Sequence, residues 1–342
     1  MDAEQIRKRL RSKRMQDRIG AVRQASALDG PDRQALLLEA LADKSPYVGA
    51  LAAEALGESA DDQAALAMTE RFGFLSEDGP ARDPGCHIRA NLAFALGRLQ
   101  YYAASDALRV GIRAVQIEPV GGVPFDTAAH LRANCALALA QIRDLDSVRD
   151  IALLLFDRSG FAHGLPDPKV KMEPREAAAR ALSLTGSAQS RLPLTLRLVH
   201  PENEEPEVLQ ECMQALVELE DPHALEVLEP YLRHRDMRLA AYAALMIAQT
   251  QAPEAAALLG EAIGRLSGDP LKATVLALTT LRTPEAAELL YALTRSDREA
   301  VRLAAIDALP PNAASRTVLG ALSTHDPSPR VRAVAKAALA AE

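Results

Sequence analysis

The sequence of 342 residues has no tryptophan, few aromatic residues and only 3 cysteines. Cys86, Cys135 and Cys212 are too few and too scattered to build a disulfide framework. No apolar run approaches the roughly 18 residues that a membrane-spanning helix needs, and the longest one runs from Leu239 to Ala248. The N-terminus is charged from Asp2 onward and lacks the apolar core of a secretory signal. These absences predict a cytoplasmic protein without a membrane span.

The overall composition excludes a disordered chain. Apolar residues make up 49% of the sequence, charged residues make up 25%, and the formal net charge is only −7. Such a chain buries enough apolar surface to fold, and its self-repulsion is modest. No strand-like alternation of any length is visible, so we expect helices throughout.

An Ala-Leu pair recurs along the whole chain and closes one small-residue helix after another. Its spacing varies between 28 and 43 residues, which is the range of helical repeats. An arginine often stands seven residues before the leucine, and an aspartate often precedes that arginine. The leucines are Leu28, Leu56, Leu96, Leu139, Leu182, Leu216, Leu245, Leu278, Leu309 and Leu339, and the arginines are Arg89, Arg132, Arg175, Arg238, Arg302 and Arg332.

The two best-formed units span residues 297–309 and 326–339, and both closely resemble the second helix of HEAT repeats. The short form of this repeat also occurs in subunits of bilin lyases. The resemblance implies an all-α fold, a right-handed α-solenoid of about ten HEAT-like helical pairs. It also implies that the arginines are structural and pair with an aspartate of a neighbouring helix. Physical reasoning agrees, because one helical pair cannot bury its apolar stripe without a neighbour.

We expect one continuous solenoid in three parts. Residues 1–30 form a basic N-terminal helical cap, residues 31–190 form repeats with long internal loops, and residues 191–342 form compact repeats. Shorter apolar helices, such as 31–42, 222–232 and 284–293, should alternate with the Ala-Leu helices and begin at proline, which is tolerated in a first turn.

Three consecutive repeats in the middle part carry inserts between their two helices. The inserts span residues 72–85, 116–126 and 157–174, and all are rich in glycine and proline, which break helices. We read residues 119–122 as a turn in which glycine supplies a positive φ. Inserts at the same place in adjacent repeats should lie side by side on one edge, where they form either a recognition edge or tolerated surface loops.

The helices after the first two inserts are close copies. His87 and Asn91 lie four residues apart on one helix face, and His130 and Asn134 repeat this pair one layer away. Armadillo repeats, relatives of the HEAT fold, use an asparagine ladder to hold an extended peptide, so the resemblance implies that role for both asparagines. The alternative is that the two amides bond to carbonyls of the inserted loops and pin them.

Catalytic and metal-binding motifs are missing from the sequence. No histidine is followed by glutamate, and no Cys-x-x-Cys pair, P-loop or Gly-x-Ser-x-Gly elbow occurs. A metal site that combines the cysteines with His87, His130 and His163 matches no compact ligand spacing. We therefore expect no enzyme activity, no metal and no cofactor.

The N-terminal segment is basic. Residues 1–23 hold eight basic and three acidic groups, a net charge of +5, and the remainder carries −12. This segment could contact nucleic acid, or it could be the solvated polar end of the solenoid. The acidic remainder would repel phosphate, which makes nucleic acid an unfavoured partner.

The sequence as a whole predicts a non-catalytic scaffold that binds a protein or peptide through a concave helix face and a loop-decorated edge. Two alternatives are an accessory subunit for cofactor or chromophore attachment, and nucleic-acid binding through the basic N-terminal helix. The candidate partner-binding residues are His87, Asn91, Phe94, Phe125, His130, Asn134, Leu137 and His163.

Overall fold

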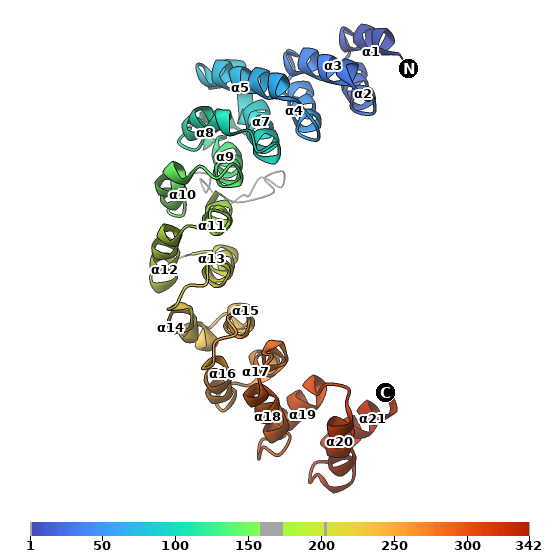
Figure 1. Cartoon of the computed structure of the whole chain (residues 1–342), viewed down its shortest axis with the longest axis vertical. Helices are drawn as coiled ribbons and strands as arrows, with labels where there is room; N and C mark the ends of the chain where they lie inside the picture. The colour runs from blue at the N-terminus through green and yellow to red at the C-terminus, as the bar shows by residue number, and fades with distance from the viewer. Residues whose placement is uncertain (1, 158–173, 202–203, 342) are drawn as a thin grey trace. The chain divides into compact units, whose positions relative to one another are not determined.

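The structure is a computed structural model that describes residues 2–157, 174–201 and 204–341. These residues form ten pairs of α-helices, so the predicted all-α solenoid of about ten pairs is confirmed (Figure 1). The first helices of the pairs are α1 (Ala3–Leu10), α3 (Pro31–Leu41), α5 (Asp62–Ser76), α8 (Ser105–Gly111), α10 (Val148–Leu154), α12 (Arg191–Val199), α14 (Ala224–Leu228), α16 (Ala255–Ile263), α18 (Pro284–Leu293) and α20 (Ala313–His325).

The second helices are the Ala-Leu helices of the sequence. They are α2 (Met15–Ser26), α4 (Pro46–Leu56), α7 (His87–Arg98), α9 (Ala129–Gln141), α11 (Pro174–Leu184), α13 (Pro206–Glu218), α15 (Met237–Gln249), α17 (Gly268–Ala277), α19 (Glu299–Ala308) and α21 (Pro329–Ala341). A short helix, α6 (Gly79–Arg82), and two strands, β1 (Ile117–Val120) and β2 (Val123–Asp126), lie in the inserts.

The chain divides into two compact units, Met1–Leu194 and Thr195–Glu342, with the boundary inside α12. In the first unit, α4, α7, α9 and α11 pack against one another in a row, and α5, α8 and α10 line the other side (Figure 1). In the second unit, α15, α17, α19 and α21 pack in the same way. Each second helix therefore buries its apolar stripe against the next, as a stacked repeat requires.

Small residues allow this close stacking. A Cβ atom on Gly57 would lie 2.8 Å from Ala95 Cα, and a Cβ atom on Gly97 would lie 2.8 Å from Ala138 Cα. Both distances are shorter than real Cβ contacts. Both glycines directly follow an Ala-Leu pair, so glycine there lets α4, α7 and α9 approach one another.

Proline begins several helices, as expected. It occupies the first turn of α3, α4, α13 and α18, where the N–H that proline lacks would have no intrahelical partner. The expected helix over residues 222–232 is wrong in its extent. The α-helix there ends at Leu228, and a 3-10 helix, Glu229–Arg233, follows because Pro230 cannot continue the α-helical ladder.

The second insert is a β-hairpin, which contradicts the expectation of helices throughout. Val120 pairs with Val123, and Gly121 and Gly122 form the turn with φ values of 60° and 86°. Two positive φ values in a two-residue loop are typical of a type I′ turn, so the predicted glycine turn is confirmed. Each strand is only four residues long and neither alternates regularly between buried and exposed side chains, so the sequence carries no strand signal here.

The first insert also differs from its predicted form. Residues 72–85 were expected to break the helix, yet α5 continues to Ser76 and α6 follows. Phe72 is fully buried in the core. Its apolar side chain belongs to the buried stripe of α5, and this burial outweighs the weak helix preference of Gly73 beside it.

Candidate functional site

A strip of half-buried and exposed side chains crosses α4, α7 and α9 at positions that are equivalent in three consecutive repeats. Tyr47, His87 and His130 each stand nine residues before the repeat leucine. The ring of Tyr47 stacks on that of His87, with centroids 5.2 Å apart and planes inclined by 30°. Tyr47 is not among the residues predicted from the sequence, although its distance of nine residues from Leu56 matches that of the two histidines from their leucines. We call Tyr47, His87, Asn91, Phe94, His130, Asn134 and Leu137 the α4–α7–α9 face.

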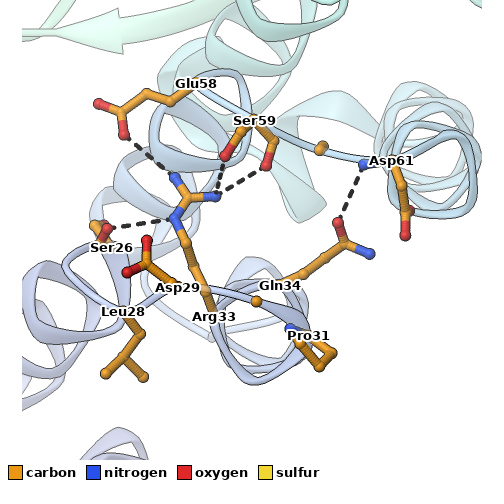
Figure 2. Close-up of a pocket in the computed structure, with 11 residues that line it drawn as sticks. Ser26, Leu28, Asp29, Pro31, Arg33, Gln34, Glu58, Ser59 and Asp61 are labelled. Carbon is orange, nitrogen blue, oxygen red and sulfur yellow. Dashed lines mark hydrogen bonds and ion pairs between the residues drawn. The ribbon is translucent and has the colours of Figure 1, made fainter.

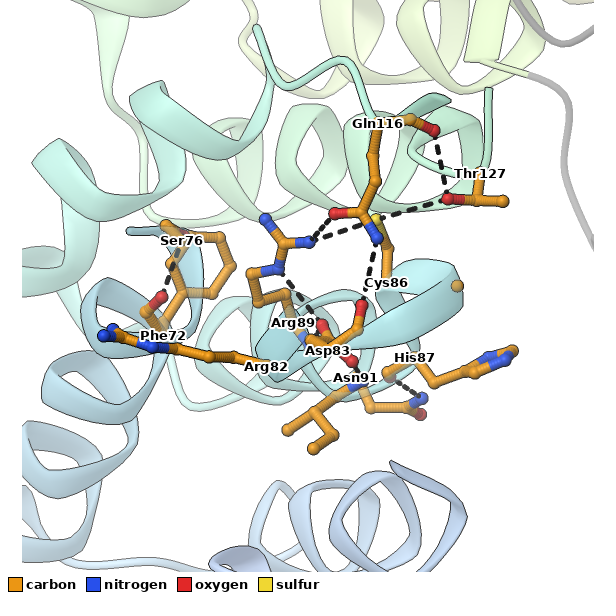
Figure 3. A network of polar contacts seen from close by, with 12 residues as sticks. Phe72, Ser76, Arg82, Asp83, Cys86, His87, Arg89, Asn91, Gln116 and Thr127 are labelled. Atoms are coloured by element: carbon orange, nitrogen blue, oxygen red, sulfur yellow. Dashed lines mark hydrogen bonds and ion pairs between the residues drawn. The ribbon is translucent and has the colours of Figure 1, made fainter. Parts of the chain in front are cut away.

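The two asparagines of this face bond to helix backbone. Asn91 Nδ2 donates to the carbonyl of His87 at 2.9 Å within α7, and Asn134 Nδ2 donates from α9 to the carbonyl of Ala90 at 2.8 Å. Among the described residues neither Nδ2 donates to an inserted loop, and both partners are helix carbonyls, which contradicts the loop-pinning alternative for the inserts described. Both asparagines lie about one turn inside their helices, where the nearest acceptors are helix carbonyls. Figure 3 shows the Asn91 nitrogen directed at His87 and its oxygen turned away.

Apolar side chains complete the α4–α7–α9 face. Phe94 is 41% exposed and lies one turn after Asn91 on α7. The guanidinium carbon of Arg98 lies 5.8 Å from the centroid of its ring, within the range of a cation–π contact. Leu137, the equivalent residue on α9, is half-buried. The face therefore combines an exposed aromatic ring with fixed amides and two imidazoles.

The hairpin is tied to the start of α7 by a buried polar network (Figure 3). Gln116 Nε2 donates to the carbonyl of Asp83 at 3.1 Å, and Glu118 Oε2 accepts from the N–H of Gly85 at 2.9 Å. The first two inserts thus meet, as their equivalent positions predicted. Burial alone would raise the pKa of Glu118, but its bonds from Thr127, Gln116 and Gly85 lower it, so this carboxylate stays charged.

Two candidate residues, Phe125 and His163, come from the inserted loops, and the structure describes only the first. Phe125 lies on β2, half-buried, opposite Glu118 in the register. His163 lies outside the described residues, and so does most of the third insert. The structure thus brings His87, Asn91, Phe94, His130, Asn134 and Leu137 together on neighbouring helices, and places Phe125 on the hairpin that precedes α9.

The cysteines are buried and unreactive. Burial raises the pKa of the Cys86 thiol to about 12, and the thiol of Cys212 likewise to about 12. Burial raises the pKa of Cys135 as well. A thiol is a nucleophile and a metal ligand only as the thiolate, so these side chains behave as small apolar groups. In the described part of the chain, no group of three or more His, Cys, Asp or Glu side chains is placed to hold a metal.

A cavity of about 630 Å³ opens between the loops that precede α3 and α5 (Figure 2). Its arginine is already saturated: Arg33 donates to carbonyls of Ser26, Ala55 and Ser59 and to the carboxylate of Glu58. Asp61, at the rim, caps α5 through the N–H of Ala64 at 2.8 Å. These polar groups hold the loops together, so we do not place a ligand site here.

Arginines link consecutive repeats, as the resemblance implied, but only at some positions. Arg302 bonds to Asp326 of the next repeat, and Arg132 bonds to Asp157 as well as to Asp126. Arg238 differs: it is exposed, and within the described ranges its side chain bonds only to Asp236, two residues earlier. The expectation of a neighbouring-helix aspartate is therefore wrong for Arg238.

Arg89 is a second departure from the expected pairing. It bonds to Asp83, in the loop before its own helix, and to Gln116 of the next repeat, which stands in place of an aspartate. Its Nη2 also donates to Cys86 Sγ at 3.2 Å. The arginine therefore belongs to the network that joins the hairpin to α7.

The basic N-terminal segment is the first helical pair, α1 and α2, and several of its cations are occupied. Arg18 is buried against Asp43, and Arg7 and Arg11 both bond to Glu39 on α3. No helix in the described part of the chain combines the length and apolar character needed to cross a bilayer.

No family model matches the chain, and no curated protein matches it in sequence. Among solved structures, it is similar to the Escherichia coli protein YibA, with 15% identity and a TM-score of 0.52 over 83% of this chain and 93% of that one. It is similar to the karyopherin Kap121p, with 12% identity and a TM-score of 0.51 over 98% of this chain and 40% of that one. The chain thus spans less than half the length of the karyopherin.

A weaker likeness concerns the phycocyanin lyase subunits CpcE and CpcF from Nostoc. The identity is 20%, and the TM-score of 0.38 covers 92% of this chain and 97% of that one. This score is too low to carry an argument about function. Together with the ten described pairs, the likeness to YibA and Kap121p confirms the fold that the repeat sequences predicted, a HEAT-like helical-repeat solenoid.

Proposed function

We propose that the chain is a non-catalytic scaffold that binds a protein or peptide segment on the α4–α7–α9 face. The observation that carries the proposal is the line of equivalent side chains across three consecutive helices, Tyr47 stacked on His87 and then His130, with Phe94 exposed beside them. Aromatic side chains at the surface are typical anchors of protein interfaces, since they bury a large area at low entropic cost.

The two asparagines are ordered before a partner binds, which supports this face as a binding surface. Their Nδ2 atoms are held by main-chain carbonyls, which fixes the orientation of each amide before a partner arrives. A side chain that is already ordered loses little entropy on binding. The amide oxygens can then accept hydrogen bonds from the N–H groups of an extended peptide.

The fold itself is suited to such a role. Kap121p, which shares the fold, has been solved bound to the SUMO protease Ulp1p and bound to Pho4p. Our choice of face rests on the residues of this chain. Nucleic-acid binding through the N-terminal pair is less favoured, because Arg7, Arg11 and Arg18 are engaged by carboxylates. No described contact favours an accessory role in chromophore attachment.

Site-specific photocrosslinking tests this function. A benzoylphenylalanine in place of Phe94 should capture one protein from native lysate. The same photoprobe in place of Tyr102, which is 60% exposed beside α8, should not capture that protein. With the purified partner, Phe94→Ala should raise the Kd about tenfold or more, as truncation of an aromatic anchor does. Tyr102→Ala, a matched exposed aromatic, should leave the Kd unchanged.

Two results would overturn the proposal. One is equal capture from both positions, which would mean adventitious contact. The other is an unchanged Kd for Phe94→Ala at wild-type helicity, which would move the binding site to another surface of the chain.

A further inference from the structure

The bond between the last two repeats shows how one repeat recognises the next. Arg302 on α19 donates from Nε and Nη2 to the two carboxylate oxygens of Asp326, at 2.9 and 3.0 Å. Its Nη1 donates to the carbonyls of Ser296 and Asp297, at 2.7 and 3.2 Å. The bonds of Nη1 to the two carbonyls therefore fix the orientation of the guanidinium. Nε and Nη2, which we call the fork, then bind the carboxylate as a bidentate pair.

The same arrangement occurs at the other end of the chain. Arg18 donates from Nε and Nη2 to Asp43, at 2.7 and 3.1 Å. Its Nη1 donates to the carbonyls of Ser12 and Lys13, six and five residues earlier. Arg18 and Arg302 thus share a pair of carbonyls that holds Nη1, and in both the carboxylate that accepts from Nε and Nη2 belongs to the following repeat.

Arg332 on α21 is the counterpart of Arg302, since each stands seven residues before its repeat leucine. Its Nη1 donates to the carbonyls of Asp326 and Pro327, at 2.6 and 3.2 Å, nearly the distances of Arg302. Its Nε and Nη2 meet no carboxylate among the described residues. The side chain is half-buried and its Nη1 is held, so Nε and Nη2 are ordered for a bidentate acceptor that the described residues do not supply.

The surroundings of Arg332 are positive. The last pair, α20 and α21, carries Arg316, His325, Arg330, Arg332 and Lys336. Among the described residues from 313 to 341 the single carboxylate is Asp326, which Arg302 already engages. Lys336 is exposed at the position where α19 buries Ile306, so this end is not built for a purely apolar neighbour.

We propose that α21 docks an acidic helical segment of a partner protein, whose Asp or Glu side chain accepts from Nε and Nη2 of Arg332 as Asp326 accepts from Arg302. The occupant is argued from continuity with the repeat interface and from charge. A second copy joined through its first pair is disfavoured, because residues 1–23 are themselves basic. This site is separate from the α4–α7–α9 face and does not depend on it.

The test uses a fluorescein-labelled peptide copy of residues 326–339 in which glutamate replaces the three basic residues. Fluorescence anisotropy with the full chain should give saturable binding that weakens with added salt. Arg332→Ala should weaken it about tenfold, and Arg332→Lys nearly as much, because lysine keeps the charge and loses the fork. Arg265→Ala, a matched exposed arginine elsewhere in the second unit, should change the Kd less than about twofold.

A second peptide, with asparagine in place of its aspartate, should bind wild type more weakly than the first peptide does, and the two peptides should bind Arg332→Ala equally. The proposal is overturned by absent binding to wild type or by Arg332→Ala binding as well as wild type at unchanged helicity. Sedimentation velocity decides the occupant: self-association that Arg332→Ala abolishes would show that the fork takes a second copy of the chain.

Discussion

At the scale of single residues, buried arginine–aspartate pairs join consecutive repeats. Arg302 is 7% exposed and Asp326 is 6% exposed, so both charges are out of water and depend on each other. Such a pair adds little net stability compared with apolar residues, yet removal of one partner leaves an uncompensated buried charge. The pair therefore sets which helices are neighbours.

Arg302→Met should accordingly lower the free energy of unfolding by about 3 kcal/mol, because Asp326 loses its counter-charge. Urea denaturation followed by circular dichroism measures this. Arg282→Met, at an exposed arginine, should stay within about 0.5 kcal/mol of wild type. Adding Asp326→Asn to Arg302→Met should recover part of the loss; a further drop instead would show that charge is not the cause.

At the scale of elements, the hairpin is a short structure that its own strands cannot stabilise. Side chains at its base hold it. Asp126 accepts from the N–H groups of Gln116 and Ala128, both at 3.0 Å, and bonds to Arg132 at 2.8 Å. Although burial raises the pKa of Asp126, these bonds and the arginine charge lower it below its usual value.

A depressed carboxyl pKa makes this anchor acid-sensitive. The stability that Asp126 contributes is complete above its ordinary pKa of about 3.9 and is lost as the pH falls through its lower folded value. Asp126→Asn should therefore melt below wild type at pH 7, and the gap in Tm should shrink as the pH falls below about 4. Asp106→Asn, at an exposed carboxylate, should show no such gap. A difference in Tm that stays constant with pH would mean that the charge of Asp126 does not stabilise the hairpin.

At the scale of the molecule, each repeat gains its core from its sequence neighbours. Ile306, Leu319, Val331 and Ala335 form one buried cluster that belongs to the last two repeats alone. Stability in such an array is a sum of repeat and nearest-neighbour contributions, so damage in one repeat spreads only as far as neighbouring contacts carry it.

Ala305→Asp places a charge at a fully buried position of α19 and should open the C-terminal repeats while the first unit stays closed. Hydrogen exchange read by mass spectrometry should show faster exchange in α18 to α21 and unchanged protection in α4, α7 and α9. Ala300→Asp, on the exposed side of the same helix, should leave exchange unchanged. Uniform acceleration over the whole chain would contradict the repeat picture.

The sequence by itself determined the ten Ala-Leu helices, because their period and small residues act locally and recur at each repeat. It also placed the two copied helices with His87, Asn91, His130 and Asn134. The tertiary structure alone decided what the amides and arginines touch. Asn134 reaches a carbonyl of α7, and Arg89 meets Gln116, through contacts between layers that are 44 and 27 residues apart in sequence. Such partners follow from stacking distance, which no local pattern encodes.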